Sequence, residues 1–138
     1  PPIVSNEYDL IEDRGSQISF SLLGHHEDIT KKELFDPEFL KRKKILSELA
    51  SEIEDLHKTY KIDVVMGGTT TLDFYESGRN KGSNILELCS HMRWDISECL
   101  YFGDALFPGG NDYTVVGCIP THEVDDYVAT YAFLRNFL

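Results

Sequence analysis

Two acidic residues stand on either side of a glycine-rich turn in the second half of the chain. A short apolar run ends in Gly103-Asp104, and Asn111-Asp112 follow a Gly-Gly pair. Gly103 is expected to let the backbone turn sharply as it leaves a strand, and the later glycines let the loop fold back. Carboxylates brought together in this way suit a hard cation such as Mg²⁺, and solvated acids on a loop are the alternative. The predicted metal ligands are Asp104, Asn111 and Asp112.

Length and charge restrict the classes of protein to which the chain can belong. It has 138 residues, 41% of them hydrophobic and 12% aromatic, which is ordinary for a globular domain. No apolar run approaches the roughly 20 residues that a membrane helix needs. The net charge of −11 argues against nucleic-acid binding, which depends on Lys and Arg to neutralise phosphates. We therefore expect neither a membrane nor a nucleic-acid partner.

The cysteines and the start of the chain predict a cytoplasmic protein. Cys89, Cys99 and Cys118 show no C-x-x-C spacing and are expected to be buried, reduced thiols. The start, Pro1 to Glu7, lacks the basic region and apolar core of a secretion signal. A start in Pro-Pro suggests that another segment precedes it.

The first half of the chain predicts a strand, a long helix and a hairpin. Residues 17–23 alternate polar and apolar side chains as a half-buried strand does. Apolar residues spaced by three and four predict a helix over residues 36–59, with Asp36 as its N-cap. The basic run 41–44 is expected to be the solvated face of this helix, with a binding patch as the alternative. Residues 62–66 and 69–75 flank a Gly-Gly turn and predict a β-hairpin.

The second half predicts part of a parallel α/β domain. A helix is expected over residues 81–92, a strand over 99–102, short strand character near Ile119 and Val124, and a terminal helix over 126–138. Trp94 is expected to anchor the core. About 58 residues cannot cover both faces of a doubly wound sheet, so apolar surface on the terminal helix could meet a partner copy, and a homo-oligomer is possible.

Five short motifs follow one another along the chain. Asp13 to Gly24 and Gly67 to Asp73 precede Lys81-Gly82, Phe102 to Asp104 and Asn111-Asp112. In this order they resemble the haloacid dehalogenase (HAD) superfamily, subfamily IIB, and its phosphomannomutase-like branch of phosphatases and phosphotransferases. The resemblance implies a HAD-like α/β fold. Residues 1–78 would form an α+β cap module that sets substrate specificity (strand, long helix, β-hairpin), and residues 79–138 the C-terminal portion of a Rossmann-like parallel-sheet core.

The resemblance also implies roles for residues in the second half. Lys81 and Asp104 would be catalytic: Lys81 steadies charge on the transferring phosphoryl group, and Asp104 binds the cofactor Mg²⁺. Asn111 and Asp112 would orient the metal, its water and Lys81. Phosphoryl transfer requires this kind of positioning and charge stabilisation. The alternative for Lys81 is a solvated lysine in the first turn of a helix.

Three residues of the first half would bind the substrate by the same resemblance. Arg14 would grip a phosphate with its planar fork of donors, and Thr71 and Asp73 would hydrogen-bond sugar hydroxyls. The alternatives are a surface ion pair between Arg14 and a neighbouring acid such as Glu12, and exposed strand positions for Thr71 and Asp73.

The sequence departs from the family pattern in two places. It contains no Asp-x-Asp followed by Gly-Thr, the motif that supplies the family's nucleophile in an N-terminal segment. The chain is therefore expected to be a fragment that is inactive alone. His25-His26 stand where the mutases have a further arginine, which favours a sugar phosphatase without excluding a mutase.

Two functions remain open at this stage. The first is a fragment of a Mg²⁺-dependent HAD-type hydrolase or phosphotransferase that acts on a phosphorylated sugar. The second is a stand-alone, non-catalytic module that binds a phosphosugar or a protein.

Overall fold

The computed structural model describes residues 9–137, and the chain divides into two compact units, Pro1–Gly78 and Arg79–Leu138. The predictions for Pro1 to Glu7 and for the last residue of the terminal helix lie outside the described residues. Within residues 9–137 no helix is long and apolar enough to cross a bilayer. The assignment of the two units to a cap and a core portion stays a prediction, and each unit is described separately below.

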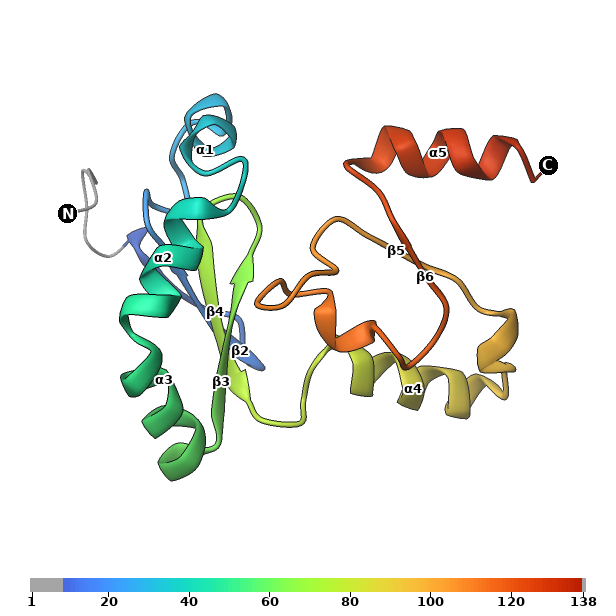
Figure 1. Ribbon diagram of the computed structural model, residues 1–138, viewed down its shortest axis with the longest axis horizontal. Helices are drawn as coiled ribbons and strands as arrows, with labels where there is room; N and C mark the ends of the chain where they lie inside the picture. The colour runs from blue at the N-terminus through green and yellow to red at the C-terminus, as the bar shows by residue number, and fades with distance from the viewer. Residues whose placement is uncertain (1–8, 138) are drawn as a thin grey trace. The chain divides into compact units, whose positions relative to one another are not determined.

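The first unit is a four-stranded antiparallel sheet with helices along one side (Figure 1). The strand order is β1-β2-β4-β3, so the β3–β4 hairpin pairs with β2 rather than standing alone. The predicted hairpin is confirmed, with Val64 opposite Phe74 and Gly67 opposite Thr71. The elements are β1 (Ile11–Asp13), β2 (Gln17–Ser21), α1 (Ile29–Phe35), α2 (Leu40–Glu48), α3 (Ala50–Asp55), the π-helical η2 (Leu56–Tyr60), β3 (Ile62–Gly67) and β4 (Thr71–Glu76).

The register of this sheet separates an apolar face from a polar face. Successive side chains of a strand point to opposite sides, so Leu72 and Phe74 share one face of β4 while Thr71 and Asp73 share the other. Leu72 and its cross-strand partner Met66 are buried and form the centre of the apolar face. The predicted sugar-binding positions therefore lie on the polar face.

The predicted helix over residues 36–59 is wrong in its continuity and its start. Three segments replace it, and α2 begins only at Leu40 after a turn in which the Phe39 backbone is left-handed, with φ of 61°. Asp36 still caps the helix, but from a position before that turn, because its carboxylate accepts hydrogen bonds from the backbone nitrogens of Lys41 and Arg42. The N-cap residue of α2 is Phe39, so the predicted N-cap position of Asp36 is wrong, although its carboxylate binds backbone nitrogens of the first turn.

The prediction that the basic run is a solvated face holds for Lys41, Lys43 and Lys44, which are exposed, and is wrong for Arg42. The Arg42 side chain is 0% exposed, and its Nε lies 2.8 Å from Oδ2 of Asp36, whose side chain is 2% exposed. Its Nη1 donates to the carbonyl oxygens of Gly67 and Gly68 at 2.7 Å and 3.0 Å, and to that of Thr71 at 3.2 Å. The buried guanidinium of Arg42 is thus compensated by the Asp36 carboxylate and by the carbonyls at the hairpin turn.

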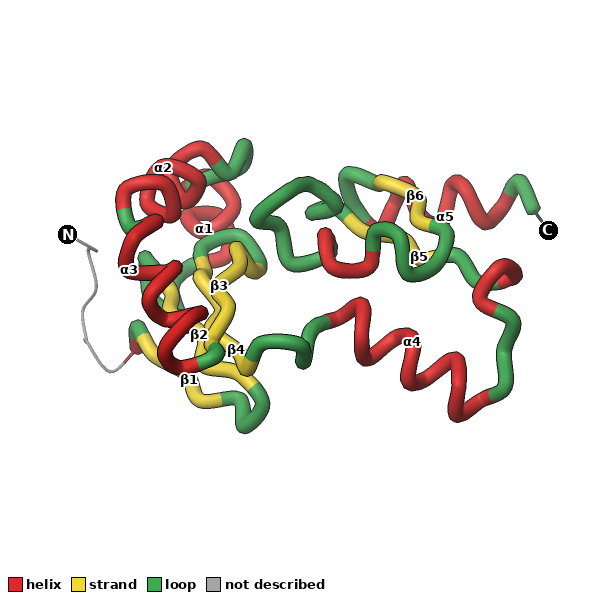
Figure 2. Tube along the Cα trace, turned by 60° about the horizontal axis from the view of Figure 1, so that its bottom comes forward, coloured by secondary structure: helices red, strands yellow, loops and turns green. Residues whose placement is uncertain are grey.

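The second unit contains a two-stranded parallel sheet and two longer helices (Figure 2). The predicted helix over residues 81–92 is confirmed with the same bounds, and Phe102 of β5 pairs with His122 of β6. Parallel strands joined by a long connection are the pattern expected of a Rossmann-like portion. The elements are α4 (Lys81–Met92), the 3₁₀ turn η3 (Ile96–Glu98), β5 (Tyr101–Gly103), the 3₁₀ turn η4 (Tyr113–Val115), β6 (Thr121–Glu123) and α5 (Tyr127–Arg135).

Aromatic side chains join α5 to the small sheet. Phe133 makes an edge contact with Phe102 at 5.1 Å between ring centroids and stacks on Phe137 at the same distance. Trp94 is not the predicted core anchor, because 52% of its surface is exposed where α4 ends. Of the three cysteines only Cys89 is buried; Cys99 and Cys118 are partly exposed, and all three are free thiols.

Candidate functional site

The Lys81 ammonium and the Asp112 carboxylate meet in the second unit, with 2.6 Å between Nζ and Oδ1. Lys81 is the first residue of α4, and a reciprocal capping box between Asn80 and Ser83 fixes where that helix starts. The Asp112 side chain is 5% exposed, whereas that of Lys81 is 45% exposed. The acid is therefore fixed inside the unit and holds a lysine that solvent or a ligand can reach.

Asp112 accepts two further hydrogen bonds. The Tyr101 hydroxyl donates to Oδ1 at 2.6 Å, and the Ala105 backbone nitrogen donates to Oδ2 at 3.2 Å. Burial alone would raise the pKa of Asp112, but the hydrogen bonds from Lys81 and Tyr101 and the lysine charge outweigh it and lower that pKa. Asp112 is thus a carboxylate that stays ionised while buried.

Tyr101 is a member of this cluster that the sequence did not predict. Burial, the hydrogen bond to Asp112, and the negative charges of Asp112 and Asp104 raise the pKa of Tyr101, so its phenol remains a neutral donor. It lies at the start of β5, two residues before Gly103. A Cβ on Gly103 would lie 2.9 Å from the Tyr101 ring, a contact that no motif in the sequence indicates.

The glycines of the loop create space next to Asp112. A Cβ on Gly103 would lie 2.7 Å from Oδ2 of Asp112, and a Cβ on Gly110 would lie 2.3 Å from the Ala105 carbonyl oxygen. The chain bends at Asp104 directly after β5, but Gly103 does not have a positive φ, so a left-handed backbone is not the reason for glycine here. The glycine is needed because the buried carboxylate packs against the backbone of the strand. Gly109, with φ of 87°, provides the turn that folds the loop back.

Asp104 follows β5 directly and is exposed. Its carboxylate has no hydrogen-bond or ion-pair partner among residues 9–137, and these residues contain no group of three His, Cys, Asp or Glu side chains that could hold a metal. Mg²⁺ commonly uses one or two protein carboxylates together with substrate phosphate and water, and a free, exposed Asp104 fits that donor set. The oxygens of Asp112 already accept three hydrogen bonds, which suits orienting Lys81 rather than direct coordination. The metal roles of Asp104, Asn111 and Asp112 stay predictions.

Gly82 should be intolerant of any side chain, because α4 lies against the η4 turn at this residue. A Cβ at this position would lie 2.0 Å from the Thr114 carbonyl oxygen. We expect Gly82→Ala to lower the free energy of unfolding of the second unit by about 2 kcal/mol, the usual range for overpacking. Urea unfolding followed by Trp94 fluorescence measures this effect. Asn84→Ala, at an exposed position of the same helix, should change stability by less than about 0.5 kcal/mol; equal effects of the two variants would contradict the prediction.

The first unit contains a second polar cluster, formed around Asp73. Its carboxylate is buried, the residue being 7% exposed, and it accepts a hydrogen bond from the Ser19 hydroxyl at 2.6 Å. The alternative of an exposed strand residue is therefore wrong for Asp73. The register places Ser19 opposite Asp73 on neighbouring strands, and a Cβ on Gly67 would lie 1.9 Å from Oδ2 of Asp73. Ser19 was not predicted, although its polar position on an alternating strand could have indicated it.

The other predicted substrate residues have local partners. Thr71 donates its hydroxyl proton to the Gly67 carbonyl at 2.6 Å. Arg14 is exposed and pairs with Glu12 at 3.0 Å, which is the surface pair given above as its alternative. His25 lies against Glu12 as well, with 3.1 Å between Nδ1 and Oε2. The substrate roles of Arg14, Thr71 and Asp73 stay predictions, with Glu12 and His25 added to the neighbourhood of Arg14.

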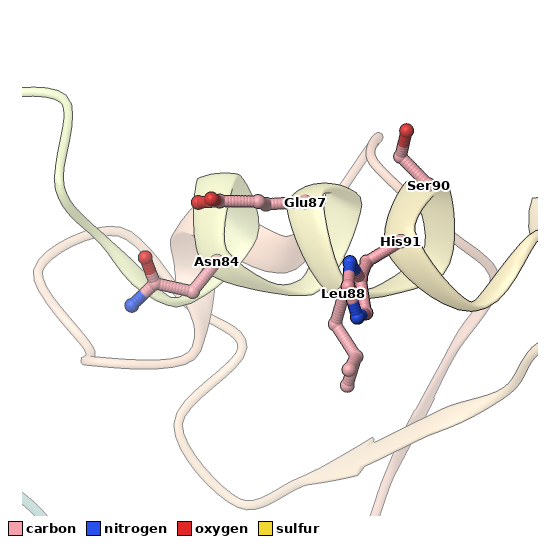
Figure 3. A pocket seen from close by; sticks show the side chains of 5 residues that line it. All are labelled: Asn84, Glu87, Leu88, Ser90 and His91. Carbon is pink, nitrogen blue, oxygen red and sulfur yellow. The ribbon is translucent and has the colours of Figure 1, made fainter.

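An open cavity of about 610 Å³ lies along α4 (Figure 3). Leu88 and His91 point to the same side of the helix there. None of the residues that line it belongs to the predicted site. The lining residues are Asn84, Glu87, Leu88, Ser90 and His91.

The two units define a mixed α/β protein. In the second unit, a lysine at the start of a helix is paired with an acid in the loop that follows a parallel strand. Residues 5–115 match the family described as haloacid dehalogenase-like hydrolase. The chain belongs to this HAD family, and its predicted fold class is confirmed.

Relatives and solved structures agree with this assignment. The chain is 32% identical over 81 residues to a phosphomannomutase of Drosophila melanogaster, covering 59% of this chain and 30% of that protein. It is similar in fold to an IMP-bound mutant of the Plasmodium falciparum IMP-nucleotidase, with 22% identity, a TM-score of 0.63, and 91% of this chain and 30% of that chain covered. An N-terminally truncated, IMP-bound form of the same nucleotidase gives 19% identity, a TM-score of 0.64, and 93% and 31% covered. The chain thus spans about a third of the length of these proteins.

Proposed function

We propose that the chain is part of a Mg²⁺-dependent HAD-type enzyme that transfers or hydrolyses the phosphoryl group of a phosphorylated sugar. The observation that carries the proposal is the ion pair between Lys81, at the start of α4, and Asp112, in the loop that also presents Asp104 directly after β5. Family membership supports the hydrolase class. The likeness to a phosphomannomutase supports the sugar phosphate.

In this proposal the residues of the chain would position charge and bind the cation, and the nucleophile would come from another segment. Asp112 keeps the Lys81 ammonium in one place, so the positive charge would be positioned before a phosphate arrives. Asp104 would provide the free carboxylate for the cation, and bound Mg²⁺ would neutralise charge on the phosphate oxygens. The attacking carboxylate would come from an Asp-x-Asp motif, which this sequence does not contain. The chain alone would therefore bind without turnover.

The test uses the longest reading frame that contains this chain. Phosphate release, and movement of the phosphoryl group from one position of the sugar to another, are measured with Mg²⁺ and a panel of hexose phosphates. IMP is included because the structural neighbours are IMP-nucleotidases. We expect Asp104→Asn and Lys81→Met each to lower the rate about a hundredfold, the usual cost of removing one charge-stabilising group. Asp125→Asn, an exposed acid before α5, is the matched control.

Two outcomes would contradict the proposal. Phosphate release that Asp104→Asn leaves unchanged would remove Asp104 from the site. The non-catalytic module would be favoured instead if the chain binds a hexose phosphate but its full reading frame neither releases nor moves the phosphoryl group of any member of the panel.

A further inference from the structure

Two of the three cysteines lie close enough to react with each other. Cys89 is in the last turn of α4, is 3% exposed, and has its Sγ 3.9 Å from Sγ of Cys99. Cys99 lies between η3 and β5 and directs its thiol to the Asp95 carbonyl oxygen at 3.4 Å. A disulfide bond is about 2 Å long, so a modest movement of the two side chains would bring the sulfur atoms together.

The two thiols differ in their access to solvent. Cys99 lines an open cavity of about 350 Å³, whereas Cys89 is buried behind it. A small reagent can therefore reach Cys99 first, with Cys89 positioned to react second. The residues that share the cavity with Cys99 are Arg93, Trp94, Asp95 and Glu98.

We propose that Cys89 and Cys99 form a dithiol site that a small-molecule disulfide converts reversibly into an intramolecular disulfide. The Cys99 thiol loses its proton to solvent, and its sulfur attacks the reagent to form a mixed disulfide while the first reagent thiolate leaves. The Cys89 sulfur, also deprotonated, then attacks the Cys99 sulfur and displaces the second thiolate. Each departing thiolate takes up a proton, so two protein thiols become one disulfide and one reagent disulfide becomes two thiols.

The surroundings of Cys99 affect how much of its thiol is ionised and ready to react. Burial, the neighbouring Cys89 thiol, and the charges of Asp95 and Glu98 raise the pKa of Cys99. Because the thiolate is the attacking species, the raised pKa leaves less of the reactive form of Cys99 at neutral pH.

A disulfide between Cys89 and Cys99 would connect the two elements that carry Lys81 and Asp104. Cys89 ends the helix that starts with Lys81, and Cys99 precedes the strand that leads to Asp104. A disulfide would join these two elements and restrict the unfolded chain as well. This inference rests on the thiol geometry and is independent of the proposed function.

The test treats the native chain with oxidised glutathione and then alkylates the remaining thiols for mass spectrometry. We expect a Cys89–Cys99 disulfide in the wild type and in Cys118→Ser, the matched control, because the Cys118 thiol donates instead to the Thr114 carbonyl. The urea midpoint, followed by Trp94 fluorescence, should rise on oxidation and return with dithiothreitol. Cys99→Ser, whose hydroxyl can keep the bond to Asp95, should form no disulfide and show no midpoint shift.

Three outcomes would overturn the proposal. They are a stable mixed disulfide on Cys99 beside a free Cys89, a disulfide that includes Cys118, and native thiols that stay unreacted while the urea-unfolded chain reacts.

Discussion

Replacing Arg42 with methionine is expected to lower the free energy of unfolding of the first unit by about 3–5 kcal/mol, the cost of breaking a buried ion pair from one side. Asp36 would keep a buried carboxylate without its cation. The carbonyl oxygens at the hairpin turn would lose their shared donor, Nη1 of Arg42. The substitution therefore removes charge compensation and hydrogen bonds in one step.

Hydrogen exchange measures this effect in the unit concerned, because the only tryptophan, Trp94, belongs to the other unit. Exchange of residues 62–76, the β3–β4 hairpin, is followed along a urea series in the full chain. Lys44→Met is the matched control, since Lys44 is exposed and its contact with Glu48 is a weak surface pair 3.8 Å long. Equal protection in the two variants would contradict a stabilising role for the buried pair.

The double variant Asp36→Leu, Arg42→Met separates the pair from its parts. Within the described residues, Nη2 of Arg42 is buried with no hydrogen-bond partner, so the native arrangement already includes an unsatisfied donor. Removing both charges should therefore recover much of the stability lost in Arg42→Met. A double variant as unstable as the single one would show that the hairpin carbonyls, rather than the charge of Asp36, dominate the loss.

Elements that local sequence determines were predicted well. The β3–β4 hairpin follows from alternating side chains around Gly67-Gly68, and α4 begins at Lys81 and ends at Met92 as predicted. In both, the residues that start and stop the element lie within it or next to it. Such signals are present in a short window of sequence.

Features that depend on distant partners were not predicted. A run of four basic residues indicates a solvated face unless the partners of one of them are known, and Arg42 contacts Asp36 six residues before it and Gly67 twenty-five residues after it. The helix expected through Leu49 is interrupted there although its apolar spacing continues. Burial of Asp73 likewise depends on Ser19, which only strand pairing brings alongside.

In the candidate site, too, the sequence indicated some residues, and others could be found only from the structure. The order of the motifs singled out both Lys81 and Asp112, and the structure brings their side chains together. The hydroxyl of Tyr101 and the backbone of Ala105 were missed, because their contribution is to satisfy a buried carboxylate. A motif identifies the residues that face a ligand more readily than those that hold them in place.

Replacing Asp112 with alanine is expected to lower the free energy of unfolding of the second unit by about 3 kcal/mol, because buried donors would lose their acceptor. The Ala105 N–H and the Tyr101 hydroxyl both bond to this carboxylate. Lys81 is half exposed and can be solvated instead, so its loss adds little. Urea unfolding monitored by Trp94 fluorescence measures the change, and Asp125→Asn, with its exposed side chain, should leave the midpoint almost unaltered.

The pH dependence of unfolding separates the contribution that the charge of Asp112 makes to stability from the contribution of its packing. Since folding lowers the pKa of this carboxyl below its ordinary value of 3.8, its ionised form stabilises the folded unit above that pH, and this stabilisation disappears as the pH falls through the folded pKa. Asp112→Asn keeps one oxygen acceptor and removes the charge, so it should cost about 1–2 kcal/mol near neutral pH. The difference from wild type should shrink below pH 3.8. A difference that stays constant into acid would show that Asp112 acts through packing alone, and the Lys81 ammonium would then be held by geometry rather than by charge.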